Sequence, residues 1–175
     1  MTDQAEAELP EAESDEAGNE GKNPGPEFEE LVDGEEVLSE LTEILYRQVP
    51  YGHFDSVSQE PTMDIFRPRP DEHSQLSTSR SGRVSAQQAY EHRVNTLQLR
   101  SAGVWGVSVE EVTNVESRAV DDSALLPDDD EKTPPGHAYI DLRHLEEAHK
   151  QDKRARDQFR QRLLIYARNR KRLYP

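Results

Sequence analysis

The chain of 175 residues contains no cysteine. Disulfide bonds and thiolate metal sites are therefore excluded. The sequence also lacks any run of about 18 consecutive apolar residues, so a transmembrane helix is not expected. Its first residues, 1–6, are acidic where a secretory signal peptide needs positive charge. We therefore expect a cytoplasmic protein without a membrane segment.

Apolar residues are scarce, since hydrophobic and charged residues each make up 33% of the chain. This apolar fraction is low for a globular protein but too high for a fully disordered one. The length corresponds to a single domain. Together these values predict one modest core with solvated ends.

The net charge of −15 is unevenly distributed along the chain. Residues 1–36 hold fourteen acids and one base, Lys22, whereas residues 150–175 hold ten bases and two acids. Residues 1–26 offer almost nothing to bury, so they cannot offset the entropy cost of ordering. We therefore divide the chain into a disordered acidic arm (1–26), a small α+β domain (27–142) and a basic amphipathic helix (143–175).

Hydrophobic periodicity predicts the elements of the central domain. The predicted fold is α+β, with a small, mostly antiparallel sheet. Its strands are expected at 44–49, 64–66, 104–109 and 138–142, with a possible further strand end at 76–79. Helices are expected at 35–43 and 86–97, the second opened by a capping box of Ser85 and Gln88. Strand 104–109 is apolar on both faces, which favours a central position, and residues 117–136 are expected to form an acidic surface loop.

The C-terminal segment predicts a helix over 143–172, with a narrow apolar stripe among many Arg and Lys side chains. Three interpretations compete: the stripe docks on the core, it binds a partner protein or a second copy of the chain, or the helix binds nucleic acid. The charge favours a helix whose terminal half projects from the domain. The candidate partner-binding residues are Arg156, Phe159, Arg160, Leu163, Tyr166, Arg168, Arg170, Lys171 and Arg172.

Several short motifs within residues 44–142 resemble a set of small uncharacterised bacterial proteins. They are Leu45–Val49, Phe66-Arg67-Pro68, Leu76-Ser77, Ser85 to Tyr90, Ser101 to Val107 and Ala138 to Asp141. The resemblance implies that this span forms one domain and that the charged ends are additions. It implies no activity.

A weaker resemblance is to ADP-ribosyltransferases, which carry an Arg on a first strand, a Ser-Thr-Ser on a later strand and a catalytic Glu. Arg47, Ser77-Thr78-Ser79, and Glu110 or Glu111 occur here in that order. The resemblance implies that Arg47 holds a pyrophosphate and that one of the two glutamates stabilises an oxocarbenium ion. However, the Glu-x-Glu or Gln-x-Glu of that family is absent.

No other constellation in the sequence predicts chemistry. Ser77, Ser79 and Ser81 lack the Gly-x-Ser-x-Gly motif of a nucleophile elbow, so a polar loop is expected there. His144 and His149 are five residues apart and do not share a helix face, and we expect neither a metal nor a cofactor. Our leading hypothesis is thus a non-catalytic accessory protein that binds a partner protein through its core and C-terminal helix. A nucleotide-using enzyme and a nucleic-acid-binding protein are the alternatives.

Overall fold

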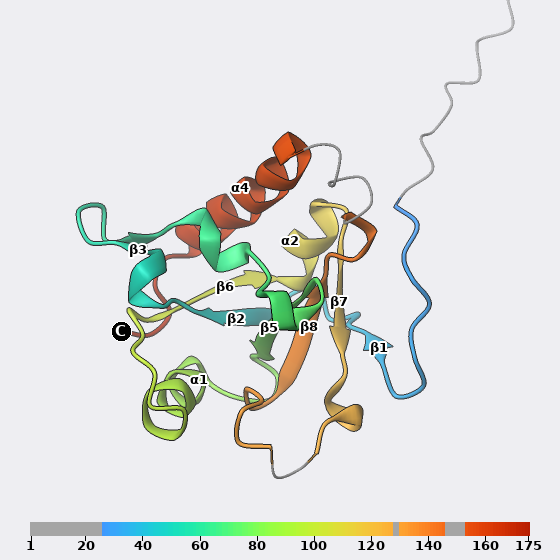
Figure 1. The fold of residues 1–175 in the computed structure, drawn as a ribbon, viewed down its shortest axis with the longest axis horizontal. Coiled ribbons are helices and arrows are strands. Elements are labelled where there is room, and N and C mark those ends of the chain that lie inside the picture. Colours follow the sequence, from blue (N-terminus) through green and yellow to red (C-terminus); the bar gives the residue numbers. More distant parts are fainter. Residues whose placement is uncertain (1–25, 128–129, 146–152) are drawn as a thin grey trace, which may run out of the picture.

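The computed structural model describes residues 26–127, 130–145 and 153–175. The predicted acidic arm, up to residue 25, lies outside the described residues. The described chain has an α+β fold, in which helices cover both faces of an antiparallel sheet (Figure 1). None of its helices within these ranges is long and apolar enough to cross a membrane.

The sheet has six strands in the order β1-β7-β8-β5-β2-β6, and all neighbours are antiparallel. In that order the strands are Glu36–Val37, Arg118–Asp121, His137–Asp141, Gln75–Arg80, Ile44–Gln48 and Val104–Ser108. A separate two-stranded ribbon pairs β3 (Phe54–Asp55) with β4 (Glu60–Pro61).

The two faces of the sheet carry different helices (Figure 1). Helices α2 (Val109–Asn114) and α4 (Lys153–Arg170) lie on one face, and α1 (Ala86–Glu91) lies on the other. Helix α1 continues directly into a π-helical turn, η4 (His92–Thr96). Short 3-10 helices complete the described elements: η1 (Tyr51–His53), η2 (Met63–Phe66), η3 (Pro70–Glu72) and η5 (Ser123–Leu125).

The main hydrophobic core lies between the sheet and α4. Alternate residues of the strands point to this side, among them the buried Leu45, Trp105 and Ile140. Phe159 and Leu163 of α4 pack against them. The apolar stripe of the C-terminal helix is therefore part of the same core as the sheet.

Much of the predicted fold is confirmed. Strands β2, β6 and β8 and helix α1 lie where the periodicity placed them. The capping box is present, since Ser85 Oγ accepts from the Gln88 backbone N–H at 3.2 Å and Gln88 Oε1 accepts from the Ser85 N–H at 2.8 Å. Residues 76–79 form the middle of strand β5.

Two predicted elements are wrong. Residues 35–43 do not form a helix, because Glu36 and Val37 pair with β7 in strand β1 and a turn follows. The segment 64–66 is not a strand but part of η2. Its consecutive residues Ile65 and Phe66 are both buried, and a strand would turn these two side chains to opposite faces.

Two positions in the sheet also differ from the prediction. The segment 117–136 is not entirely loop, because it contains β7, which pairs with β1 and β8. Strand β6 is not central but lies at one end of the strand order. Its outer edge is covered by the C-terminal residues, since the Leu173 N–H donates to Val104 O at 2.8 Å and the Val104 N–H donates to Tyr174 O at 2.9 Å. This coverage protects the exposed edge of the strand. Both of its faces are apolar because α4 and α2 contact it from one side of the sheet and α1 from the other.

The C-terminal helix ends two residues earlier than predicted and does not project. The described helix α4 ends at Arg170, and the predicted helical residues 146–152 lie outside the described residues. Its terminal half contains the fully buried Leu163 and Ala167, so the expectation that this half projects is wrong. Burial of the apolar stripe outweighs the charge of the surrounding arginines, because long cationic side chains keep their charged groups at the surface.

Candidate functional site

A cavity of about 150 Å³ lies where β2 and β5 meet the η2–η3 segment, η4 and the loop before β8. Its basic lining residues are Arg47, Arg67, Arg69, Arg93 and Lys132. Glu72 is the one acidic residue among those that line it. The chain as a whole has a net charge of −15, so this concentration of positive charge is a local feature of the cavity.

Arg47 forms the base of the cavity. It projects from β2, and its side chain is only 17% exposed. Its Nε donates to the backbone oxygen of Ile65 at 2.8 Å, its Nη1 donates to that of Ser77, and Nη1 lies 3.5 Å from Glu72 Oε1. Burial lowers the pKa of the Arg47 guanidinium, and the nearby Arg69 lowers it further, while Glu72 opposes both effects. These contacts hold the guanidinium in one position and leave it only partly neutralised.

Two further arginines, Arg93 and Arg69, place their positive charge in the same cavity. Arg93 comes from the π-helical turn η4, a type of turn that is frequent at functional sites. Burial lowers the pKa of Arg93, and Arg47 and Arg69 lower it further. Arg69 is 64% exposed and lies 3.6 Å from Glu72. Arg47 and Arg69 thus share the buried carboxylate of Glu72, and Arg69 also lies 3.4 Å from the exposed Asp71. Arg93 adds a third positive charge to the same space, and this charge favours an anion in the cavity.

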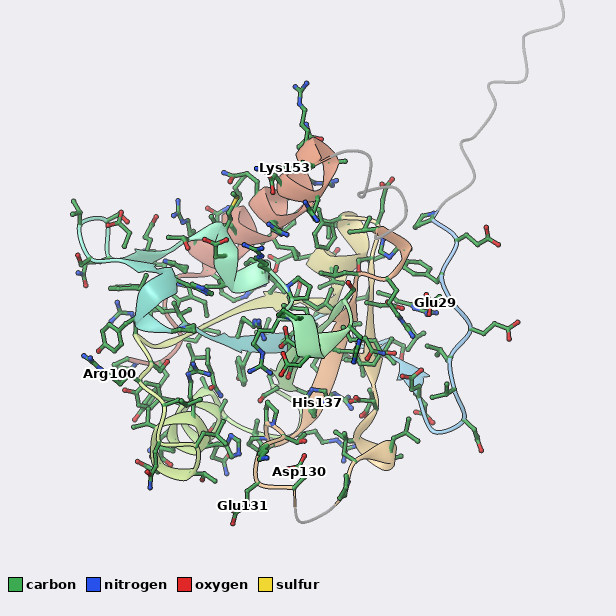
Figure 2. All side chains as sticks on the ribbon, in the orientation of Figure 1. Glu29, Arg100, Asp130, Glu131, His137 and Lys153 are labelled. Carbon is green, nitrogen blue, oxygen red and sulfur yellow. The ribbon has the colours of Figure 1, made fainter. Side chains whose placement is uncertain are left out.

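Ser77 lines the cavity and begins a chain of three polar groups. Its Oγ lies 2.9 Å from Nε2 of His137, and Nδ1 of His137 lies 2.6 Å from Oδ1 of Asp122. An ionised carboxylate only accepts hydrogen bonds, so Nδ1 donates to Asp122 and Nε2 accepts from the Ser77 hydroxyl. Figure 2 shows His137 at the end of β8 next to the loop that carries Asp130 and Glu131. This arrangement has the donor sequence of a Ser-His-Asp triad.

The structure brings Arg47 and Ser77 together but does not bring Glu110 or Glu111 to them. The Glu110 N–H donates to Leu41 O at 3.0 Å, at the opposite end of β2 from Arg47. At ~3.3 Å per residue, the strand alone puts ~10 Å between Ile44 and Arg47. Glu111 caps the start of α2 and lies 2.9 Å from Arg170. The carboxylate that the ADP-ribosyltransferase resemblance requires is therefore not part of this site.

Most of the predicted partner-binding residues of α4 make contacts within the domain itself. Phe159 and Leu163 are buried, and Tyr166 packs against the core. Arg160, only 9% exposed, lies 3.4 Å from Asp157. The stripe is thus not a free surface for a partner in this structure.

The basic residues at the end of α4 and beyond it attach the helix to the body. Arg168 donates to Pro61 O at 2.7 Å, Arg170 pairs with Glu111, and the Arg172 guanidinium lies 5.0 Å from the centre of the Trp105 ring. Lys171 is exposed, and so is much of the polar face of the helix. Partner binding through the residues of this segment stays a prediction.

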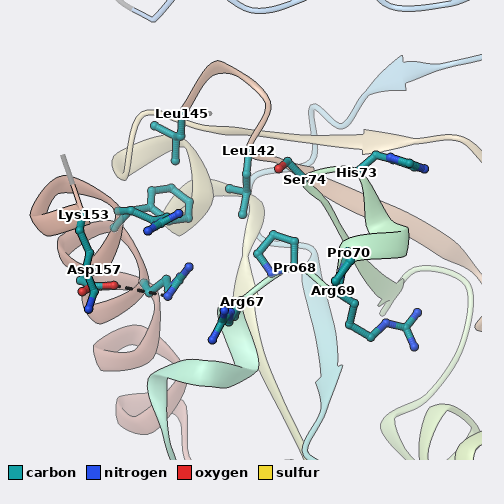
Figure 3. Close-up of a pocket in the computed structure, with 13 residues that line it drawn as sticks. Arg67, Pro68, Arg69, Pro70, His73, Ser74, Leu142, Leu145, Lys153 and Asp157 are labelled. Carbon is teal, nitrogen blue, oxygen red and sulfur yellow. Dashed lines mark hydrogen bonds and ion pairs between the residues drawn. The ribbon is translucent and has the colours of Figure 1, made fainter. Parts of the chain in front are cut away.

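A larger groove of about 600 Å³ lies between α4 and the segment 67–70. Its basic lining residues are Arg67, Arg69, Lys153, Arg156 and Arg160, and Asp157 is the one acid among the lining residues. In Figure 3, Arg67 points toward α4, whereas Arg69 points away from it. The predicted partner-binding residue Arg156 therefore contributes to a basic groove between α4 and this segment.

Sequence reasoning missed most of the residues of the site. Arg69, Arg93, Asp122 and His137 belong to no local motif, and only pairing of distant strands brings the last two together with Ser77. The order Ser77, Asp122, His137 along the chain was the available signal, because it is the order of the triad residues in α/β-hydrolases. The expected polar loop at Ser77 is instead a strand.

Comparisons of the chain with protein-family models, curated proteins and solved structures give no match. The candidate site therefore stands on its own geometry.

Proposed function

We propose that this protein binds a small ligand through a phosphate or diphosphate group held in the Arg47 cavity. The observation that carries the proposal is the surplus of positive charge: Arg47, Arg69 and Arg93 influence one another, and Glu72 is the single acid among the lining residues. A buried cation without a full set of counter-charges is costly, and a bound anion removes that cost.

The charge of the site supports a phosphate group more than a carboxylate, because a phosphate monoester carries about −1.5 to −2 at pH 7. Nε and Nη1 of Arg47 already donate to protein oxygens, so its Nη2 is the nitrogen that remains to donate to such a group. Arg47 is fixed by the carbonyl oxygens of Ile65 and Ser77, which reduces the entropy lost on binding. The 150 Å³ cavity accommodates a group of a few atoms. The rest of the ligand then lies outside, over the exposed Arg67 and Arg69.

Titration calorimetry with inorganic phosphate and with pyrophosphate tests the proposal. The variant Arg93→Gln removes one charge without touching the backbone contacts of Arg47. A hydrogen bond to a charged group contributes ~1.5–3 kcal/mol. Pyrophosphate affinity should therefore fall by ~10- to 100-fold. Its matched control, Lys171→Gln, removes an exposed cation at the end of α4 and should bind like the wild type.

Two results would overturn this function. One is the absence of heat and of thermal stabilisation at millimolar pyrophosphate. The other is equal loss of affinity in Arg93→Gln and Lys171→Gln, which would mean that the anion responds only to overall charge.

A further inference from the structure

We propose that Ser77 is a nucleophile, activated by His137 and Asp122, that hydrolyses a carboxylic ester bearing a phosphate group. The choice of substrate rests on the proposed function, because the arginines of the cavity would hold the phosphate. The nucleophile itself rests on separate geometry, the contacts of 2.9 Å and 2.6 Å that join the three side chains.

The sheet fixes these three groups on neighbouring strands. Ser77 lies in β5, His137 begins the adjacent β8, and Asp122 follows β7 on the other side of β8. Side chains held by paired strands keep their relative positions better than side chains on loops. His137 and Asp122 are only 13% and 15% exposed, whereas Ser77 lines the cavity. The base and its partner are thus shielded from water, and the residue that they contact is among those that line the cavity.

The chemistry follows from the hydrogen-bond directions. Oγ of Ser77 attacks the carbonyl carbon of the ester, and its proton passes to Nε2 of His137. Asp122 stabilises the imidazolium that results. The bond from carbon to the alcohol oxygen then breaks, and this oxygen takes the proton from His137, leaving an acylated serine. A water molecule then attacks the acyl carbon and gives one proton to His137. The bond from this carbon to Oγ of Ser77 breaks, the acid leaves, and Oγ takes the proton back from His137.

Arg47 contacts Ser77 through the main chain only. Its guanidinium donates to the backbone oxygen of Ser77, whereas the register of β2 and β5 places the two side chains on opposite faces of the sheet. The reactivity of the hydroxyl therefore rests on His137 and Asp122. A serine in a purely structural hydrogen-bond network would not react with an electrophile.

Labelling with a fluorophosphonate, a reagent for activated serines, tests the inference by intact mass and peptide mapping. We expect one adduct per wild-type molecule, located on Ser77, and none on Ser77→Ala. The matched control Ser58→Ala removes an exposed hydroxyl that also contacts a carboxylate, Asp55, and should label at the wild-type rate. Asp122→Asn should label ~10²- to 10⁴-fold more slowly, while its pyrophosphate affinity stays unchanged.

The outcomes separate the two proposals. Pyrophosphate binding without any wild-type adduct would overturn the nucleophile and leave anion binding intact. An adduct on Ser77 without pyrophosphate binding would support the nucleophile and overturn the anion site. An adduct that persists in Ser77→Ala, or an Asp122→Asn rate equal to the wild type, would also refute the triad.

Discussion

Replacing Arg47 with methionine removes the one cation that lies deep in the sheet next to Glu72. The Glu72 side chain is 6% exposed, so the substitution leaves a nearly buried carboxylate without its Nη1 partner at 3.5 Å. The backbone oxygens of Ile65 and Ser77 lose their donors as well. Breaking a buried ion pair from one side costs ~3–5 kcal/mol. We expect the free energy of unfolding, measured by urea denaturation, to fall by this amount.

A double-mutant cycle identifies the source of the loss. Glu72 accepts a hydrogen bond from the Arg69 backbone N–H at 2.6 Å. Glu72→Gln keeps an oxygen that can accept this bond but removes the negative charge. In the double variant no carboxylate is left unpaired, so the two losses should not add, and a coupling of ~1–3 kcal/mol is expected. Additivity within ~0.5 kcal/mol would refute the view that charge compensation holds Arg47 in place.

Two further substitutions test the core and the buried charges. Trp105→Ala should lower the free energy of unfolding by ~3–5 kcal/mol. The Trp105 ring is only 2% exposed, packs on Phe54, and lies below the Arg172 guanidinium. A loss below ~1 kcal/mol would contradict this. In Asp141, burial raises the pKa, but hydrogen bonds from Arg143 and Arg118 outweigh it and leave the pKa lowered. The carboxylate therefore stabilises the fold above the unfolded pKa of ~3.9 and loses this effect as the pH falls through the lower, folded value. The stability deficit of Asp141→Asn in urea should accordingly be large at pH 7 and shrink below pH ~4, and a deficit independent of pH would refute the assignment.

Neighbouring residues were sufficient to predict those helices and strands whose apolar pattern matches the side chains that the fold buries. Strand β6 and helix α1 show this agreement, since the short apolar run around Trp105 and the capping box at Ser85 each depend on neighbouring residues alone. The predicted helix at 35–43 fails because Val37 pairs with Val120, 83 positions away. Such a tertiary partner overrides a local apolar period, and a single sequence does not reveal it.

The candidate site was predictable only in part for the same reason. Arg47 and Ser77 were noticed through a family resemblance, and their neighbouring positions on β2 and β5 made the contact possible. His137 reaches Ser77 only because β8 pairs with β5, and Asp122 reaches His137 only because β7 pairs with β8. Each of these strand pairs joins residues that lie far apart in the sequence, so no local motif reveals that they meet.

The basic residues of the C-terminal segment have two different surroundings in the folded structure. Arg168 and Arg170 face Glu60 and Glu111 and bind the helix to the body. Arg156 and Arg160 instead line the groove beside Arg67, where Asp157 is the one acid among the lining residues. Arg168 and Arg170 are thus each paired with a glutamate, whereas Asp157 pairs with Arg160 at 3.4 Å and is outnumbered by the basic residues of the groove. Within the C-terminal segment, the excess positive charge therefore lies at the start of α4, and not at the end of the helix where the sequence concentrates its charge.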